Sequence, residues 1–348
     1  MVSGATGDDA PAPIDDIRVS VIIPVFNDAA HLPHAIASVL DQVPPVVELV
    51  IVDDGSTDGS AEIADRACAD PRVRVIHQAN AGPGAAANVG LASITGTHVL
   101  LVDSDDWLEV EALATLIPMA RQWDPDVVSF GARVVDEHGE AIAADGRQAH
   151  SHYAKPDLTP AISGVDYYQR VQATGWVTAS SKTYLWRYAY LKEIRLRVPE
   201  TYIYEDEYFT PIAVLCAASV VSTSRALYVR MNRPGSLTMR PLSAFNTEQR
   251  IDSAALLRDA AEAVASTAGT DARRLIIDRS RRLARAALVE SERIGNEREA
   301  IAMLRARLGI GPDALGLVGW LMTLRIRLTA ASSRLSSLLS SRGQGAQR

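Results

Sequence analysis

The chain has 348 residues, of which 47% are hydrophobic, and this proportion excludes a mainly disordered protein. Its length allows one large α/β domain with an appended piece. The formal net charge of −7 excludes a general basic field for nucleic acid, so an anionic ligand must be bound locally by backbone amides, a metal ion or single arginines.

The N-terminal end and the two cysteines bear on the cellular compartment. Residues 1–17 are acidic and contain two prolines, so we predict a disordered tail that is not a signal peptide. Cys68 and Cys216 stand far apart in apolar surroundings, which favours buried thiols in a reducing cytosol. No uncharged apolar run of about 18 residues occurs, which argues against a transmembrane helix. We therefore predict a cytoplasmic protein.

From residue 18 onward, apolar residues alternate between strand-like runs and helical spacing. Strands are predicted at 19–23, 46–52, 73–77, 98–102 and 126–130, and helices at 28–42, 57–69, 84–93 and 109–121. Strands that alternate with helices predict right-handed βαβ units. The expected fold class is α/β, with a mostly parallel, doubly wound sheet.

The second half of the chain has a different composition. Residues 133–160 are polar and weakly patterned, and we predict a loop or a small hairpin there. Residues 163–240 hold most of the aromatic side chains, which either bind a sugar or another flat polar ligand or pack a smaller subdomain. Residues 241–348 are rich in Ala, Leu, Arg and Glu and predict a helical C-terminal region.

A glycine motif follows the third predicted strand. The run Gly82-Pro83-Gly84-Ala85-Ala86-Ala87 fits the G-x-G-x-x-A fingerprint, and Asp103 follows the next strand. This pattern is typical of dinucleotide-binding oxidoreductases. In such a fold the glycines follow the strand directly, whereas Gln78, Asn80 and Ala81 intervene here. The oxidoreductase interpretation also gives no role to the acids elsewhere in the chain.

Carboxylates follow two of the predicted parallel strands. Asp53 and Asp54 begin the run DDGSTDGS, and Asp103 and Asp105 belong to the run DSDD. The carboxyl ends of parallel strands meet at the crevice where ligands bind. Mg²⁺ or Mn²⁺ typically takes one or two carboxylates together with phosphate oxygens and water. A D-x-D alone also fits a solvated turn, but its combination with DDGSTDGS favours a metal and a phosphate-bearing ligand.

Three motifs together resemble the family-2 glycosyltransferases of GT-A fold in their order and spacing. They are VSVIIPVFNDAAHLPHAIASVLDQ, ELVIVDDGSTDGSAEIA and NAGPGAAANVGLASITGTHVLLVDSDD. The resemblance is close over residues 18–130 and looser as far as 240. It implies a GT-A catalytic domain at 18–240, in which 18–130 bind a nucleotide-sugar and 131–240 form the acceptor side.

The resemblance also implies a donor-nucleotide site with a metal ion. Asp54 is expected to accept a hydrogen bond from uracil or another base. The other residues implied for the donor are Pro24, Val25, Phe26, Asn27, Asn80, Gly82, Asn88, Asp103 and Ser104. Asp105, together with Asp103, is implied to bind Mn²⁺ or Mg²⁺, which would neutralise the leaving diphosphate.

On the acceptor side, the run YEDEYF resembles the E-D-x-x-F element of the family. It implies Asp206 as the general base and Glu205 as a neighbour that raises the pKa of the base or orients the acceptor. Spacing alone also fits acids that favour a helix N-terminus. The residues implied beside the sugar, the diphosphate or an anionic acceptor are Trp176, Lys182, Arg230 and Arg233.

The sequence departs from the family at two points. Ala87 stands where many relatives have an arginine, so a contact made there must come from elsewhere. The Q-x-x-R-W element of processive synthases is absent from the sequence, which favours a single transfer per encounter.

Two other functions fit the sequence less well. A nucleotidylyltransferase would need a G-G-x-G-x-R-L run where PVFNDAAHL stands. A non-catalytic scaffold would not need the intact catalytic and metal-binding acids.

The predicted activity is inverting transfer of a hexosyl or N-acetylhexosaminyl group from a nucleotide-diphosphate donor, with UDP favoured. The expected acceptor is a cell-surface glycan, a teichoic-acid-like polymer or a lipid-linked molecule. Residues 315–339 combine apolar side chains with Arg325, Arg327 and Arg334. Three interpretations of this segment stay open: a peripheral helix at the inner face of the membrane, a contact with a partner subunit in a homo-oligomer, and a buried helix.

Overall fold

A computed structural model describes residues 16–142, 153–174, 179–201, 203–233, 236 and 241–311. Most of the predicted N-terminal tail, the residue Trp176 and the segment 315–339 lie outside these ranges. The described residues form two compact units. One holds residues 16–240 and 262–273, and the other holds 241–261 and 274–311.

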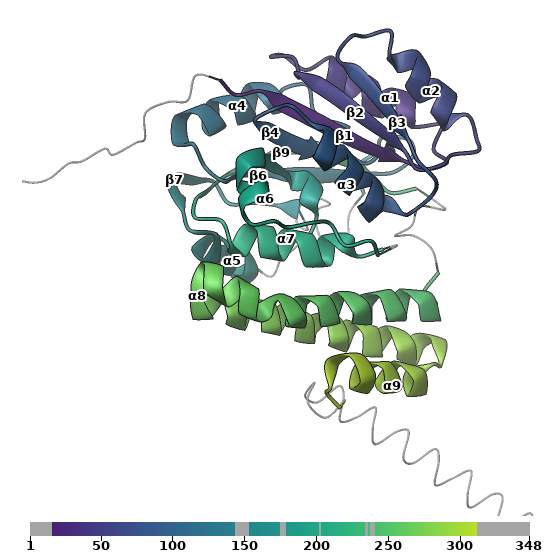
Figure 1. The fold of residues 1–348 in the computed structure, drawn as a ribbon, viewed down its shortest axis with the longest axis vertical. Helices are drawn as coiled ribbons and strands as arrows, with labels where there is room; N and C mark the ends of the chain where they lie inside the picture. The colour runs from purple at the N-terminus through teal and green to yellow at the C-terminus, as the bar shows by residue number, and fades with distance from the viewer. Residues whose placement is uncertain are drawn as a thin grey trace, which may run out of the picture. The chain divides into compact units, whose positions relative to one another are not determined.

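Within the described residues of the first unit, nine strands form one sheet (Figure 1). They are β1 (Val19–Val25), β2 (Glu48–Asp53), β3 (Val73–His77), β4 (His98–Leu101), β5 (Trp107–Leu108), β6 (Val127–Val135), β7 (Leu158–Ile162), β8 (Tyr184–Arg187) and β9 (Val220–Met231). The order is β3-β2-β1-β4-β8-β6-β9-β5, with β7 on β9, and the first four strands are parallel. The predicted mostly parallel α/β sheet is therefore confirmed.

Helices cover both faces of this sheet. They are α1 (Leu32–Leu40), α2 (Ser60–Ala67), α3 (Pro83–Ser93), α4 (Ala112–Trp123), α5 (Gly164–Ala173), α6 (Tyr188–Glu193) and α7 (Glu205–Leu215). Alternate residues of β1, beginning at Val19, pack with Leu32 of α1 and Leu113 of α4. Ile22 points to the other face, where a Cβ added at Gly90 of α3 would lie 2.4 Å from its Cγ2. A small residue at position 90 thus lets α3 lie close to the sheet.

The parallel strands bring three polar loops to one edge of the sheet. Val25 of β1 pairs with Asp53 of β2, and Ile22 of β1 pairs with Leu101 of β4. Because these strands run in the same direction, the residues that follow each of them meet at their shared carboxyl edge. The runs FND, DDGSTDGS and DSDD all begin there.

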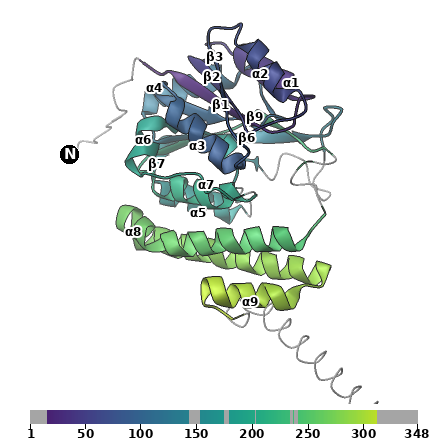
Figure 2. The same cartoon turned by 45° about the vertical axis from the view of Figure 1, so that its right-hand side comes forward.

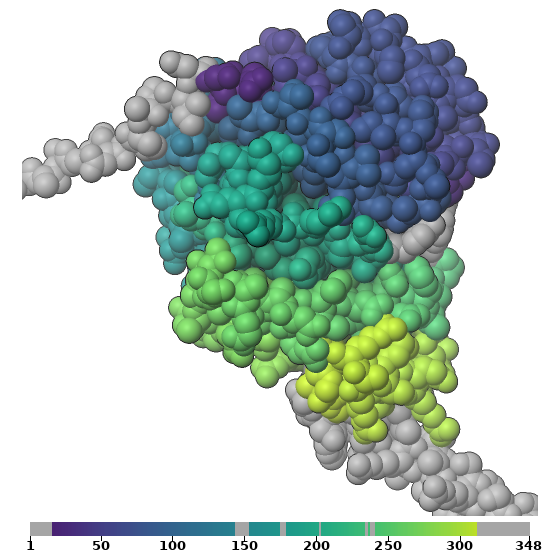
Figure 3. All heavy atoms as spheres, in the orientation of Figure 1, coloured from purple at the N-terminus to yellow at the C-terminus, as the bar shows by residue number. Residues whose placement is uncertain are grey.

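The chain beyond residue 130 joins the same sheet. β8 pairs antiparallel with both β4 and β6, and β6 runs parallel to β9. Figure 3 shows the atoms of this half, coloured teal, packed directly against the blue atoms of the first half. One expectation for this half is corrected. β6 extends to Val135, into the range expected as a loop or a small hairpin, because its partner β9 is long enough to continue the pairing to Met231.

The thiols differ from the expectation of burial. Cys68 is exposed and Cys216 is partly buried, and both are free. Cys68 is the residue that ends α2, after its last helical turn, so its side chain does not share the buried face of that helix. The expectation of a buried thiol is therefore wrong for Cys68.

The second unit is helical (Figure 2). α8 spans Ala244–Ile294 with a non-helical Gly269 inside it, and its residues 262–273 are counted in the first unit; α9 spans Glu297–Leu308. Ser243 begins α8 with a capping box that includes Asn246. An ion pair of 2.7 Å joins Arg250 to Glu290, so the two arms of α8 lie side by side. The helical region predicted here is confirmed.

No helix among the described residues is both long and apolar enough to cross a membrane.

Candidate active site

Asp54 shapes the glycine turn at the edge of the sheet. Its Oδ1 accepts hydrogen bonds from Gln78 Nε2 (2.7 Å) and Ala81 N (2.9 Å), and its Oδ2 accepts one from Gly82 N (2.8 Å). Gly82 has φ 91°, a conformation that glycine adopts at low cost. The carboxylate expected to meet the base thus also holds the turn that carries Asn80, an exposed residue implied for the donor.

Gly84, the second glycine of the motif, lies against the backbone of Pro199, a residue far along the chain. A Cβ added at Gly84 would lie 2.0 Å from the carbonyl oxygen of Pro199. On the same helix, Asn88 Nδ2 donates to Val198 O (2.7 Å), and Asn88 Oδ1 accepts from Val198 N (3.0 Å). α3 is therefore joined to the segment that leads into Glu205, and the amide of Asn88, implied for the donor, is bonded to that segment.

Gly84→Ala is expected to destabilise the protein by about 2 kcal/mol, because the added methyl forces the Pro199 backbone away from α3. Thermal unfolding of the two proteins measures the difference. Gly311→Ala is the matched control, since a Cβ at position 311 would meet nothing within 4 Å. Equal losses of stability in the two variants would show that the close approach of Gly84 to Pro199 does not contribute to stability.

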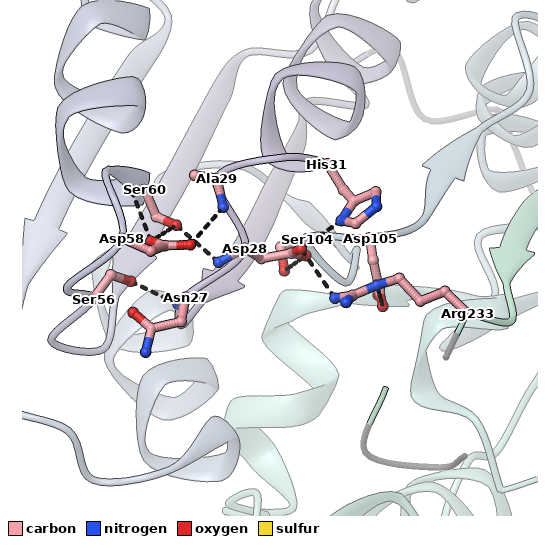
Figure 4. A network of polar contacts seen from close by, with 10 residues as sticks. All are labelled: Asn27, Asp28, Ala29, His31, Ser56, Asp58, Ser60, Ser104, Asp105 and Arg233. Atoms are coloured by element: carbon pink, nitrogen blue, oxygen red, sulfur yellow. Dashed lines mark hydrogen bonds and ion pairs between the residues drawn. The ribbon is translucent and has the colours of Figure 1, made fainter. Parts of the chain in front are cut away.

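Asp28 connects the loop after β1 to the D-S-D turn (Figure 4). Its Oδ2 accepts from Ser104 Oγ (2.7 Å), and its Oδ1 lies 2.6 Å from His31 Nδ1 and 3.0 Å from Arg233 Nη2. Arg233 Nε lies 3.1 Å from Asp105 Oδ2. One guanidinium therefore bridges two carboxylates from two different strand ends.

The sequence analysis missed Asp28 as a site residue. Asp28 was only the first residue of the helix predicted at 28–42, although it follows the first parallel strand at the same edge as the other acids. The position of Asp28 at that edge was the sequence signal that could have identified it as a site residue. The loop is also held by Asn27, which has φ 51° and whose Oδ1 accepts from Thr57 N (2.7 Å). Phe26, implied for the base pocket, is 46% exposed beside it, and Pro24 and Val25 end β1.

The run from Asp103 to Asp106 turns sharply after β4. Asp106 is buried and accepts from Tyr228 Oη (2.7 Å) and Met231 N (2.8 Å). The Tyr228 hydroxyl accepts in turn from Asp103 N (3.1 Å). Burial raises the pKa of Asp106 well above its usual value, and the charges of Asp103 and Asp105 add to the shift. β9 and the D-S-D turn are thus fixed to each other through one buried carboxyl group.

Asp103 and Asp105, the two partly exposed acids of this turn, carry oxygen atoms that suit a divalent cation. Burial raises the pKa of Asp105, and repulsion from Asp103 and Asp28 raises it further. Added positive charge relieves such crowding, and carboxylate oxygens are the ligands that Mg²⁺ and Mn²⁺ prefer. Among the described residues, no group of three or more His, Cys, Asp or Glu side chains is placed to hold an ion. A cation at Asp103 and Asp105 would therefore have to take its remaining ligands from phosphate and water.

Two adjacent acids face the turn from the other half of the sheet. Glu205 and Asp206 begin α7, directly after Tyr204, whose φ of 67° is unusual for a residue other than glycine. Lys182 Nζ lies 3.0 Å from Asp206 Oδ2, 3.6 Å from Glu205 Oε1 and 3.4 Å from Asp103 Oδ1. The implied base and the implied metal-binding turn therefore share one ammonium group.

The pKa of Glu205 is raised to about 7, chiefly by burial; Lys182 lowers it in part, and the neighbouring charge of Asp206 adds to the increase. When the pKa of an acid is higher in the folded protein than in the unfolded chain, the acid lowers the free energy of unfolding. For Glu205 this loss is absent at a pH below the unfolded pKa of 4.5 and grows as the pH rises towards 7. Glu205→Gln removes this loss. We therefore expect the free energy of unfolding of the variant, relative to that of the wild type, to increase by about 2 kcal/mol when the pH is raised from 5 to 8.

Urea unfolding of both proteins at the two pH values measures this gain. A difference that does not change with pH would contradict the raised pKa of Glu205.

Arg230 belongs to β9. Its guanidinium contacts the Tyr153 hydroxyl and lies over the ring of that tyrosine, with 5.7 Å from Cζ to the centroid. Burial would lower its pKa, but the charges of Tyr153 and Asp106 raise it. The structure thus places Arg233 and Lys182 at the acids of the turn and Arg230 against Tyr153, and Trp176 lies outside the described residues.

Comparisons with known proteins identify the family of the chain. A family model described as "Glycosyl transferase family 2" matches residues 20–184. The glycosyltransferase GlyG of Streptococcus pneumoniae is 30% identical over 224 residues, which are 63% of this chain and 72% of GlyG. The uncharacterized glycosyltransferase EpsJ of Bacillus subtilis is 31% identical over 229 residues. That match covers 64% of this chain and 63% of EpsJ, so the chain spans less than two thirds of that relative.

Solved structures share the fold. The crystal structure of S. aureus TarS 1-349 in complex with UDP-GlcNAc has a TM-score of 0.64 and 23% sequence identity. The superposition covers 84% of this chain and 82% of the TarS chain. The family match spans the acids after β2 and β4 and the turn that carries Lys182. With GlyG matched over most of its length, the chain belongs to glycosyltransferase family 2.

Proposed function

We propose that this glycosyltransferase moves a sugar from a UDP-linked donor to a hydroxyl group of a glycan or lipid-linked acceptor, with inversion at the sugar C1 carbon. One observation carries the proposal. Acids at the end of β4 and acids at the start of α7 face one another across Lys182, which contacts both groups. A donor diphosphate at the first group and an acceptor hydroxyl at the second would place the sugar between them.

In this proposal, Asp206 is the general base. The acceptor oxygen forms a bond to C1 while the bond from C1 to the diphosphate oxygen breaks on the opposite face. The hydroxyl proton passes to the Asp206 carboxylate. Attack opposite to the leaving group inverts the configuration at C1.

Asp105 and Asp103 would hold Mn²⁺ or Mg²⁺, which neutralises charge on the departing diphosphate. Arg233 bridges Asp28 and Asp105 and lies beside that position, so its guanidinium is placed to meet phosphate oxygens. Exposed Phe26 is placed to stack on a base beside the turn held by Asp54. The UDP and UDP-GlcNAc complexes of TarS support UDP and an N-acetylhexosaminyl group as the first donor to test.

Most aromatic residues of the acceptor side are buried and pack the protein, so they do not define the acceptor. The cations at the site would suit an acceptor that contains phosphate, such as a teichoic-acid-like polymer.

A panel of nucleotide-sugars tests the donor. The purified full chain is mixed with each sugar and Mn²⁺, thermal shift reports binding, and UDP release with cell-wall and lipid-linked acceptor extracts reports turnover. We expect a UDP-sugar to raise the melting temperature and UDP release to require an acceptor extract. Binding without turnover on any extract would identify a non-catalytic scaffold instead.

A further inference from the structure

Lys182 is surrounded by three carboxylates. Its Nζ donates to Asp206 Oδ2 at 3.0 Å and lies within 3.6 Å of both Asp103 and Glu205. Its side chain is 12% exposed, against 16% for Glu205, 23% for Asp206 and 44% for Asp103. An ammonium group has three N–H donors, so it can serve all three carboxylates at once.

The backbone holds Lys182 at this point. It lies in a short 3-10 turn, Ser181–Thr183, directly before β8. Trp186 Nε1 donates to Ser181 O (3.2 Å), and the ring of Trp186 lies edge-on to Phe209 of α7 with centroids 5.6 Å apart. The turn that carries the lysine and the helix that carries Asp206 therefore pack through the same pair of buried rings.

The charge of the lysine is secured by its surroundings. Burial alone would lower the pKa of Lys182, but the charges of Asp103, Asp206 and Glu205 raise it well above its usual value. The ammonium is strongly held among three acids, and a strongly held cation at hydrogen-bond distance fixes the position of the Asp206 carboxylate.

We propose that Lys182 is a positioning residue for the base, whose ammonium fixes the Asp206 carboxylate relative to Asp103 and so sets the gap between acceptor and donor. This deepens the proposed function and rests on it. It differs from the role that the family resemblance implies for Lys182, which is a contact with the sugar. A base displaced by about 1 Å can cost about 100-fold in rate.

Lys182→Met and Lys182→Arg test this role. We expect Lys182→Met to lower kcat by about 100-fold while the affinity for UDP with Mn²⁺, measured by titration calorimetry, changes by less than about threefold. Lys182→Arg keeps the charge and is expected to recover at least about tenfold of the loss. The matched control is Lys192→Met, which removes an exposed lysine that lies over Tyr188 in α6 and is expected to leave kcat unchanged.

A double variant decides whether Lys182 acts through Asp206. If it does, adding Lys182→Met to Asp206→Asn lowers the residual rate by less than about threefold, because residues that act as a unit are not additive. A loss of about 100-fold in that background, or UDP affinity that falls in parallel with kcat, would overturn the proposal in favour of a direct contact with the donor.

Thermal unfolding of the same variants supplies a readout that needs no activity. We expect Asp206→Asn to raise the melting temperature of Lys182→Met, because it removes one of the acids left crowded without their cation. If Asp206→Asn lowered the melting temperature equally in the wild type and in Lys182→Met, the proposed pairing of Lys182 with Asp206 would be wrong. A wild-type chain that releases UDP from no nucleotide-sugar would refute the proposed function, and the unfolding cycle would still decide whether Lys182 and Asp206 are coupled.

Discussion

Asp206→Asn lowers the rate of sugar transfer by about 1,000-fold while the affinity for UDP stays within about threefold of wild type; this is the expected result if Asp206 is the base. Asparagine keeps the shape of the side chain and an oxygen for Lys182, but it cannot take the acceptor proton. UDP release under saturating donor gives kcat, and titration calorimetry gives the UDP affinity.

Glu207→Gln is the matched control, because Glu207 lies in the same first turn of α7 and has no assigned role in the site. It is expected to retain wild-type kcat. If Asp206→Asn kept full activity, Asp206 would be removed from the mechanism, and Glu205, whose pKa of about 7 suits proton transfer near neutral pH, would be the next candidate.

Local patterns predicted the edge of the sheet where the acids meet. The third strand was predicted at 73–77, and β3 spans those residues, because a β-branched run followed by polar residues has one clear boundary. The acids of DDGSTDGS and DSDD could be placed at one edge without coordinates. Parallel strands must end together, and the alternation of strands with helices implied a parallel sheet.

Contacts between distant segments could not be predicted in the same way. Gly84 resembled part of a phosphate-binding turn, and nothing in its neighbours shows that its backbone lies against Pro199, 115 positions later. The role of Asp28 depends on Arg233, a contact that joins residues 205 positions apart. Such pairs depend on how the sheet is completed by β8, β6 and β9, whose order does not follow from their sequence.

Asp106 shows how a buried group supports the site without facing it. Asp106→Ala is expected to destabilise the protein by about 3 kcal/mol, because the hydroxyl of Tyr228 and the backbone N–H of Met231 lose their partner in the interior. For a unit of this size, such a loss lowers the melting temperature by about 6–12 °C. Glu62→Ala, which changes an exposed acid of α2, is the control and is expected to cost less than about 0.5 kcal/mol.

Asp106→Asn separates the loss of hydrogen bonds from the loss of charge. The raised pKa of Asp106 favours its neutral form, which asparagine resembles, so we expect this variant to keep most of the stability that alanine loses. Because the same carboxyl group joins β9 to the turn of Asp103, Asp106→Ala is also expected to weaken UDP binding by about tenfold, since Arg233 and Asp105 would no longer be held in register. Asp106→Asn losing as much stability as Asp106→Ala would show that the ionised form is the one that holds the turn.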